Sequence, residues 1–114
     1  MKRAMIGGIC LLVSTLPANA TPWAAQIVGE ILAYASFCKA VEVDFVAMEY
    51  WARQRGVSVE QFKTRVGPDF RALNFGNEVA REKLADMSVG DVCAEAIRLY
   101  GPSGINVSGM VKLK

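Results

Sequence analysis

Histidine is absent from the 114 residues of this chain. The missing imidazole excludes the Ser-His-Asp triad, the histidine-paired cysteine nucleophile and the common zinc sites. The sequence also contains no G-x-G-x-x-G motif and no phosphate-binding loop, the usual marks of a nucleotide site. We therefore expect a protein that is not an enzyme and that holds no cofactor and no metal.

Long apolar runs are scarce as well. The one apolar run, residues 4–16, follows Lys2 and Arg3 and is shorter than the ~20 residues of a membrane-spanning helix. An A-x-A sequence ending at Ala20 comes soon after it. A positive start, an apolar run and small residues at the end are typical of a secretory signal peptide, cleaved here between Ala20 and Thr21. We expect a periplasmic or secreted protein whose mature chain has no membrane span.

Cysteine occurs three times. Cys10 would leave with the signal peptide, and Ile9 stands where a lipoprotein would need a small residue before its lipidated cysteine. Cys38 and Cys93 then remain as an even pair in an oxidising compartment. Their spacing is unlike the C-x-x-C of a redox-active dithiol, so we predict a structural Cys38–Cys93 disulfide. In the chain-entropy model, closing a loop of about 55 residues stabilises the fold by roughly 4 kcal/mol.

Excess charge of either sign is also missing. The chain has 13 basic and 11 acidic residues, and Lys2 and Arg3 leave with the signal peptide, so 11 basic residues face 11 acidic ones. A neutral chain without a basic run gives no reason to expect nucleic acid or an anionic membrane as a partner. Another protein is the partner that we expect, and the sequence does not indicate an oligomeric state.

Helical periodicity is the main structural pattern. Residues 88–100 place their apolar side chains on one stripe, with Ser88 as the N-cap and Gly101 as the stop. Asp44 is a predicted N-cap, and Ser58 and Gln61 have the spacing of a capping box. Gly76 and Asn77 have the chemistry of a turn. Further helices are predicted at residues 23–39, 45–55, 58–66 and 78–87, with one more helical turn at 69–75. Alternatively, residues 78–100 form one longer helix.

The fold class that follows is all-α, a small bundle of four to five short helices linked by one disulfide, with an extended C-terminal tail. The predicted division is a signal peptide at 1–20, a helical domain at 21–101 and a flexible tail at 102–114. Ile105, Val107 and Val111 alternate with polar or small residues, as in a short strand, but no partner strand is evident.

The remaining candidates for chemistry are carboxylates and arginines. Glu42 and Asp44 could form an acid/base pair, although a solvated charge and a helix cap explain them more simply. Glu30 is predicted to be solvated. Four arginines could converge on an anion, and three acidic residues spaced four apart form a stripe that is either a solvated face or a docking surface for a basic partner. The arginines are Arg53, Arg55, Arg65 and Arg71, and the acidic residues are Glu78, Glu82 and Asp86.

In outline, a short, exported, helical chain with one disulfide resembles two kinds of periplasmic protein. One is the acid-activated chaperone, and the other is the immunity protein that neutralises a cell-wall hydrolase in type VI secretion. The resemblance covers architecture and carries over no site residue. It implies a non-enzymatic binding or interaction protein. The alternatives are a structural accessory of an envelope or secretion machine and a minimal helical enzyme that uses carboxylates and arginines.

Overall fold

The computed structural model describes the backbone of residues 16–114 and the side chains of residues 23–114. Most of the predicted signal peptide lies outside this range, and the side chains of Ala20 and Thr21 also lie outside it. The signal peptide and its cleavage site therefore remain predictions. Among the described residues, no helix is both long and apolar enough to cross a membrane.

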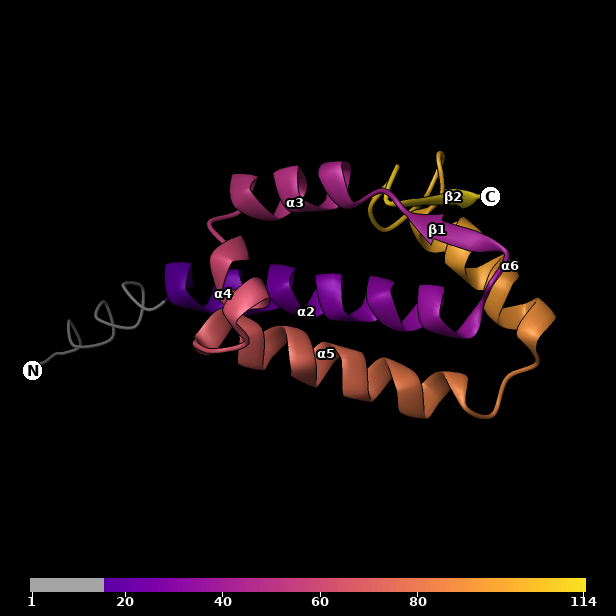
Figure 1. Ribbon diagram of the computed structural model, residues 1–114, viewed down its shortest axis with the longest axis horizontal. Helices are drawn as coiled ribbons and strands as arrows, with labels where there is room; N and C mark the ends of the chain where they lie inside the picture. Colours follow the sequence, from indigo (N-terminus) through magenta and orange to yellow (C-terminus); the bar gives the residue numbers. More distant parts are fainter. Residues whose placement is uncertain (1–15) are drawn as a thin grey trace, which may run out of the picture.

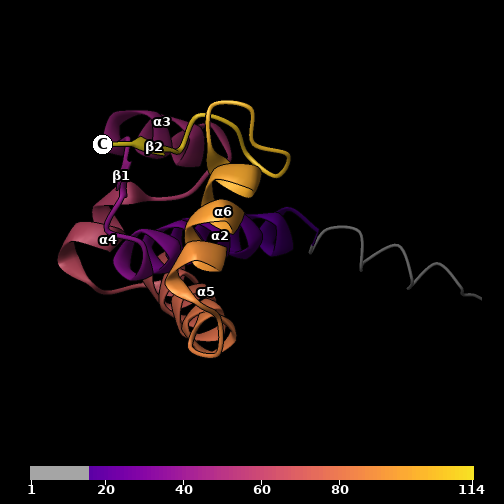
Figure 2. The ribbon, with the colours of Figure 1, turned by 90° about the vertical axis from the view of Figure 1, so that its right-hand side faces the viewer.

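Five helices and two short strands make up the described part of the chain, which confirms the all-α fold class. Helix α2 runs through the middle, with α3 on one side and α5 on the other, and α6 crosses one end (Figures 1 and 2). The elements in chain order are α2 (Leu16–Phe37), β1 (Val41–Val43), α3 (Phe45–Gln54), α4 (Val59–Thr64), α5 (Pro68–Leu84), α6 (Val89–Tyr100) and β2 (Val111–Leu113).

The central position of α2 explains its composition. Its small and branched residues are buried on several sides, because α3, α5, α6 and β1 all pack against it. A helix that is apolar around most of its circumference is typical of such a central element. The buried side chains of α2 are those of Ala24, Ala25, Ile27, Val28, Ile31, Ala33 and Tyr34.

Helices α2 and α5 lie side by side over most of their length (Figure 1). Gly29 and Gly76 make this approach possible, since a Cβ atom on either one would overlap the backbone of the other helix. Asn77 adds a hydrogen bond, in which its Nδ2 donates to the carbonyl oxygen of Gly29 at 3.0 Å. The turn predicted at Gly76 and Asn77 is therefore wrong, because both residues serve helix–helix contact within an unbroken α5.

Helix α6 matches its prediction closely. The Ser88 side chain accepts a hydrogen bond from the backbone N–H of Asp91, and the helix ends before Gly101. The alternative of one longer helix is wrong, since α5 ends at Leu84 and α6 starts anew after the Ser88 cap. Cys93 of α6 forms a disulfide with Cys38, which follows directly after α2. The first and last described helices are thus covalently linked, as predicted.

The C-terminal tail ends in a strand with a partner, so the expectation of no partner strand is wrong. Strand β2 pairs antiparallel with β1, with Val43 opposite Val111. Before it, the tail folds back over the end of α6, where its backbone N–H groups satisfy the carbonyls of Leu99 and Tyr100. Met110 and Val111 are buried. Strand pairing between residues so far apart in sequence leaves no local pattern that would predict it. Flexibility of residues 102–114 stays a prediction.

Candidate functional site

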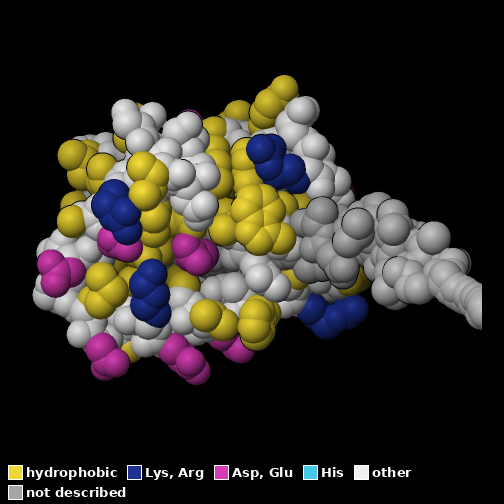
Figure 3. All heavy atoms as spheres, turned by 180° about the vertical axis from the view of Figure 1, so that it is seen from behind, with side chains coloured by type: hydrophobic (Ala, Val, Ile, Leu, Met, Phe, Trp, Pro, Cys, Tyr) yellow, Lys and Arg dark blue, Asp and Glu magenta, His cyan; other side chains and the backbone are white. Residues whose placement is uncertain are grey.

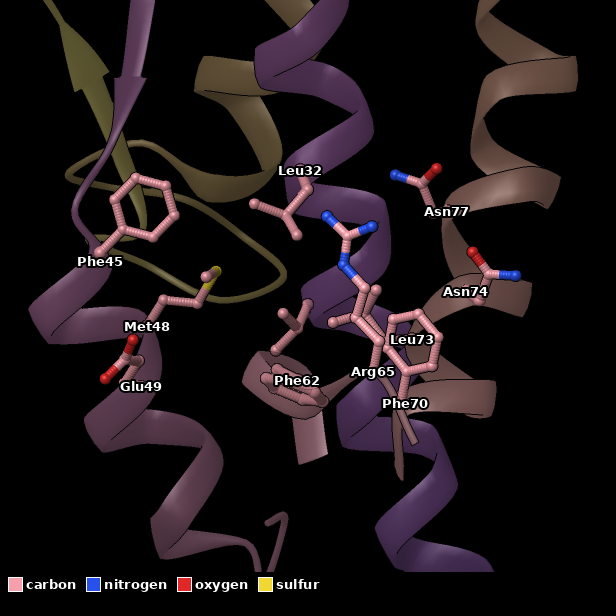
Figure 4. A pocket seen from close by; sticks show the side chains of 11 residues that line it. Leu32, Phe45, Met48, Glu49, Phe62, Arg65, Phe70, Leu73, Asn74 and Asn77 are labelled. Atoms are coloured by element: carbon pink, nitrogen blue, oxygen red, sulfur yellow. The ribbon is translucent and has the colours of Figure 1, made fainter. Parts of the chain in front are cut away.

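A groove of about 390 Å³ lies between α2, α3, α4 and α5 (Figure 4). Its volume falls in the range of about 300–1,000 Å³ that is usual for ligand sites in proteins. Most of its lining is apolar, and the polar members are few. The apolar lining residues are Val28, Leu32, Phe45, Met48, Phe62, Phe70 and Leu73, and the polar ones are Glu49, Arg65, Asn74 and Asn77.

The arrangement of the helices explains why the groove exists. Helices α3 and α5 lie on opposite sides of α2 (Figure 1), and a strip of α2 between them forms the floor of the groove (Figure 4). Val28 and Leu32 belong to that strip, Met48 comes from α3, and Leu73 comes from α5. The short helix α4 contributes Phe62 and packs against both α3 and α5. The groove is therefore built on helices at every side.

The start of α3 is fixed at two points. The Asp44 side chain accepts from the backbone N–H of Ala47 at 3.0 Å, which confirms the predicted N-cap. The backbone N–H of Asp44 in turn donates to the carbonyl of Met110 in the tail at 2.8 Å. Phe45 comes next in the chain and lines the groove while 56% exposed. The tail thus holds the α3 wall in place.

The junction of α4 and α5 is held by a buried carboxylate. Asp69, which is 6% exposed, accepts from the backbone N–H of Ser58 at 2.7 Å, and its own N–H donates to Gln61 Oε1 at 2.7 Å. The capping box predicted for Ser58 and Gln61 is therefore wrong, and the Ser58 side chain makes no capping hydrogen bond. In a capping box the Gln61 side chain would accept a hydrogen bond from the backbone N–H of Ser58. Here the carboxylate of Asp69 accepts that hydrogen bond instead.

Arg65 occupies an unusual backbone position beside the groove. It caps the C-terminus of α4 with φ 62° and ψ 36°, the left-handed region that normally favours glycine or asparagine. Among the described residues, it is the only one other than glycine with a positive φ. Such a conformation costs an ordinary L-residue roughly 1–2 kcal/mol. In Figure 4 its side chain extends along the groove toward Leu32.

The second charged lining residue already has a partner. Glu49 lies on the α3 wall, and its carboxylate is 3.7 Å from the guanidinium of Arg53. This pair is partly exposed and spaced four residues apart on a helix, so it contributes at most about 0.5 kcal/mol to stability. It nevertheless neutralises much of the charge on that wall.

A separate group of polar side chains fastens α6 to α2. Tyr34 and Tyr100 are fully buried and meet edge to face, with ring centroids 5.9 Å apart. The Tyr100 hydroxyl donates to the carboxylate of Glu30 and accepts from Asn106 Nδ2 at 3.0 Å. The expectation of a solvated Glu30 is therefore wrong, because its carboxylate accepts a hydrogen bond from a buried tyrosine. Lys83 Nζ donates to the Tyr34 hydroxyl at 3.0 Å, which connects α5 to the same group.

The electrostatics of this tyrosine group follow from its burial. Desolvation raises the pKa of Tyr100 well above its ordinary value, and the hydrogen bond to Glu30 raises it further. The hydrogen bond to Tyr34 raises the pKa of Lys83, and the carboxylates of Glu30 and Glu95 add to that effect. The Tyr100 hydroxyl thus stays protonated, and it can donate the hydrogen bond that links α6 to Glu30 on α2.

The other predicted candidates are not brought together. Glu42 lies across the two strands from Lys112 at 3.9 Å, while Asp44 caps α3, so the two carboxylates form no acid/base pair. The Arg55 guanidinium stacks over the ring of Trp51, and of the four arginines considered only Arg65 lines the groove. The groove therefore holds one of the four arginines and not a convergent set.

The acidic stripe is an exposed edge of the molecule. Glu78 and Glu82 are exposed on α5, and Asp86 is exposed just beyond its end. Figure 3 shows acidic side chains gathered along the lower edge of the molecule, the side on which α5 lies in Figure 1. In residues 23–114, no group of three His, Cys, Asp or Glu side chains is arranged to hold a metal ion.

The groove itself was not found by sequence reasoning. Its lining comes from four helices, and residues such as Phe62 and Leu73 have the spacing of ordinary core residues. No local pattern in the sequence sets the lining residues apart from core residues. No family model, no curated protein and no solved structure matches this chain.

Proposed function

We propose that this protein is an exported, non-enzymatic binding protein whose partner is another protein. The groove between α2, α3, α4 and α5 is the site at which an apolar segment of that partner docks. The sequence supports export through its secretory leader pattern, and the Cys38–Cys93 disulfide fits an oxidising compartment.

The observation that carries the proposal is the groove with its apolar lining. Seven of its eleven lining residues are apolar, and Phe45 remains 56% exposed although it is a large aromatic. Aromatic residues and methionine are enriched in protein interfaces, and exposed apolar surface beside a groove marks sites of interaction. A partner side chain that enters the groove would cover Phe45, Met48 and Phe62 together.

The alternative of a minimal helical enzyme gains no support from the arrangement. That reading needs several arginines facing a carboxylate inside a cavity, whereas the groove contains one arginine. A structural accessory of an envelope machine remains the second reading, and it predicts contact through the tail rather than through the groove.

Two charge substitutions at neighbouring positions separate these readings. Phe45→Glu places a carboxylate in the groove, while Val46→Glu places the same charge next to it on a side chain that is 82% exposed and does not line the groove. Both positions lie in the first turn of α3, where a carboxylate favours the helix. We therefore expect both variants to fold.

The assay is capture of the partner by the tagged full-length protein, expressed with its own leader in its native compartment. We expect the wild type and Val46→Glu to retain one protein partner, and Phe45→Glu to lose it. Intact mass of the same material should show a chain that starts at Thr21. Equal capture by all three proteins, or no partner for any of them, would contradict the proposal.

A further inference from the structure

The two charged side chains that line the groove differ in whether they have an ion-pair partner. Glu49 and Arg65 are its only charged lining residues, and Glu49 lies 3.7 Å from Arg53. Among the described residues, no carboxylate lies within 4.0 Å of the Arg65 guanidinium. The groove therefore presents one solvent-exposed guanidinium without an ion-pair partner beside an apolar lining. A guanidinium in that setting favours a carboxylate, which it can bind through two hydrogen bonds.

The backbone conformation of Arg65 gives the fold no reason to have arginine at this position. Glycine and asparagine adopt its left-handed conformation with less strain. The arginine side chain makes no hydrogen bond to another described residue that would offset this preference. Residues other than glycine in sparsely populated backbone regions cluster at functional sites. The strain is thus compatible with a role for the side chain in binding.

Two large apolar side chains remain exposed, one in the groove lining and one next to Arg65 in the chain. Phe45 on the α3 wall is 56% exposed, and Val66, directly after Arg65, is 63% exposed. A small ligand inside the groove would leave Val66 in water, because Val66 is not part of the lining. A polypeptide segment lying along the groove can cover exposed Phe45 and continue beyond the lining, which a small ligand cannot do.

From these observations we infer that the groove binds a partner segment in which apolar side chains are adjacent to a carboxylate. The apolar side chains enter the groove, and an aspartate or glutamate of the partner pairs with Arg65. This inference rests on the proposed function and adds the chemistry of the partner to it. Hydrophobic grooves of other proteins bind amphipathic helices in a comparable way, with apolar side chains spaced along one helix face as anchors.

The test uses random peptides of about 12 residues displayed on phage and selected on the wild-type protein at low salt. Selected peptides are expected to carry Asp or Glu next to apolar residues. Their affinity should fall about tenfold for Arg65→Asn, which removes the charge and suits the left-handed backbone. Arg65→Lys should lose less, and a rise in salt should weaken binding to the wild type more than to Arg65→Asn. A Tm of Arg65→Lys equal to that of the wild type, and a Tm of Arg65→Asn equal or higher, verify that the fold is intact.

The outcomes separate the inference from the proposed function. Peptides that depend on Phe45 but bind Arg65→Asn as tightly as the wild type would overturn the inference and leave the proposed function standing. Selection of basic peptides would overturn the inference as well. Peptides indifferent to Phe45→Glu, or no enrichment at all, would overturn both. Binding of dodecanoate in an Arg65-dependent manner, without any peptide, would assign the groove to a lipid instead.

Discussion

Removal of the disulfide is the perturbation whose size the structure fixes best. Cys38 and Cys93 are 55 residues apart, and they join the end of α2 to α6. In the chain-entropy model, a loop of this length contributes about 4 kcal/mol by restricting the unfolded chain. A domain of this size has a total free energy of unfolding of about 5–15 kcal/mol. The double variant Cys38→Ala, Cys93→Ala should therefore be folded but much less stable.

Thermal unfolding followed by circular dichroism measures the effect. A loss of about 4 kcal/mol corresponds to a fall in Tm of roughly 20 °C for a domain of about 100 residues. Urea unfolding should give the same difference in free energy, with a larger m-value for the double variant, because an unfolded chain without the crosslink exposes more surface. Treatment of the wild type with a reductant should reproduce the behaviour of the double variant, and the double variant should not respond to the reductant.

A small effect would refute this reasoning. If the double variant lost less than about 1 kcal/mol, loop closure would not be the source of stability that the chain-entropy model assigns to it. The contacts of the tyrosine group would then keep α2 and α6 together after partial unfolding, so that the chain gains little freedom when the disulfide is removed. Non-coincident transitions by different probes would identify such an intermediate.

Two further predictions concern helix packing and the tyrosine group. Gly76→Ala should lower the free energy of unfolding by about 1–3 kcal/mol, because its Cβ would overlap the backbone of Gln26 on α2. Gly90→Ala is the matched control; it meets no atom within 4 Å and should stabilise α6 by about 0.5–1 kcal/mol in the same urea titration. For Tyr100, the raised folded-state pKa adds stability that is fully present below the unfolded value of about 10 and is lost as pH rises above it. Tyr100→Phe should flatten that alkaline decline, and an unchanged slope would contradict the assignment.

The sequence predicted well those features that depend on local spacing. Ser88 and Asp44 act as N-caps as expected, and the apolar stripe of α6 buries Val92, Ala96 and Tyr100. The disulfide followed from counting cysteines. Each of these features is set by residues close together in the chain or by an even pair of thiols, and needs no knowledge of the tertiary arrangement.

Features that depend on distant partners were missed. Gly76 and Asn77 have turn chemistry, but α2 supplies a helix against which the same two residues pack. Ser58 and Gln61 have capping-box spacing, but Asp69 takes over their hydrogen bonds. In both cases a tertiary contact outweighed the local preference for a turn or a cap. The sequence alone does not show which distant residue will make that contact.

The groove could not be predicted either, because its lining comes from helices that are far apart in the sequence. Its apolar lining is indistinguishable from core in the sequence, since Leu32, Phe62 and Leu73 have helical spacing and would each be assigned to the interior. Only the spatial separation of α3 from α5 leaves them around an open space. Arg65 is the one lining residue whose backbone sets it apart, and that conformation is visible only in the folded chain.

The location of a bound segment tests the central claim most directly. Methyl chemical shifts of the full-length protein, recorded with and without the captured partner or a selected peptide, report that location. We predict the largest changes at Val28, Leu32 and Leu73 in the groove, and none at Leu113 on β2. Changes concentrated at Leu113 and the tail, with the groove methyls unmoved, would contradict the account.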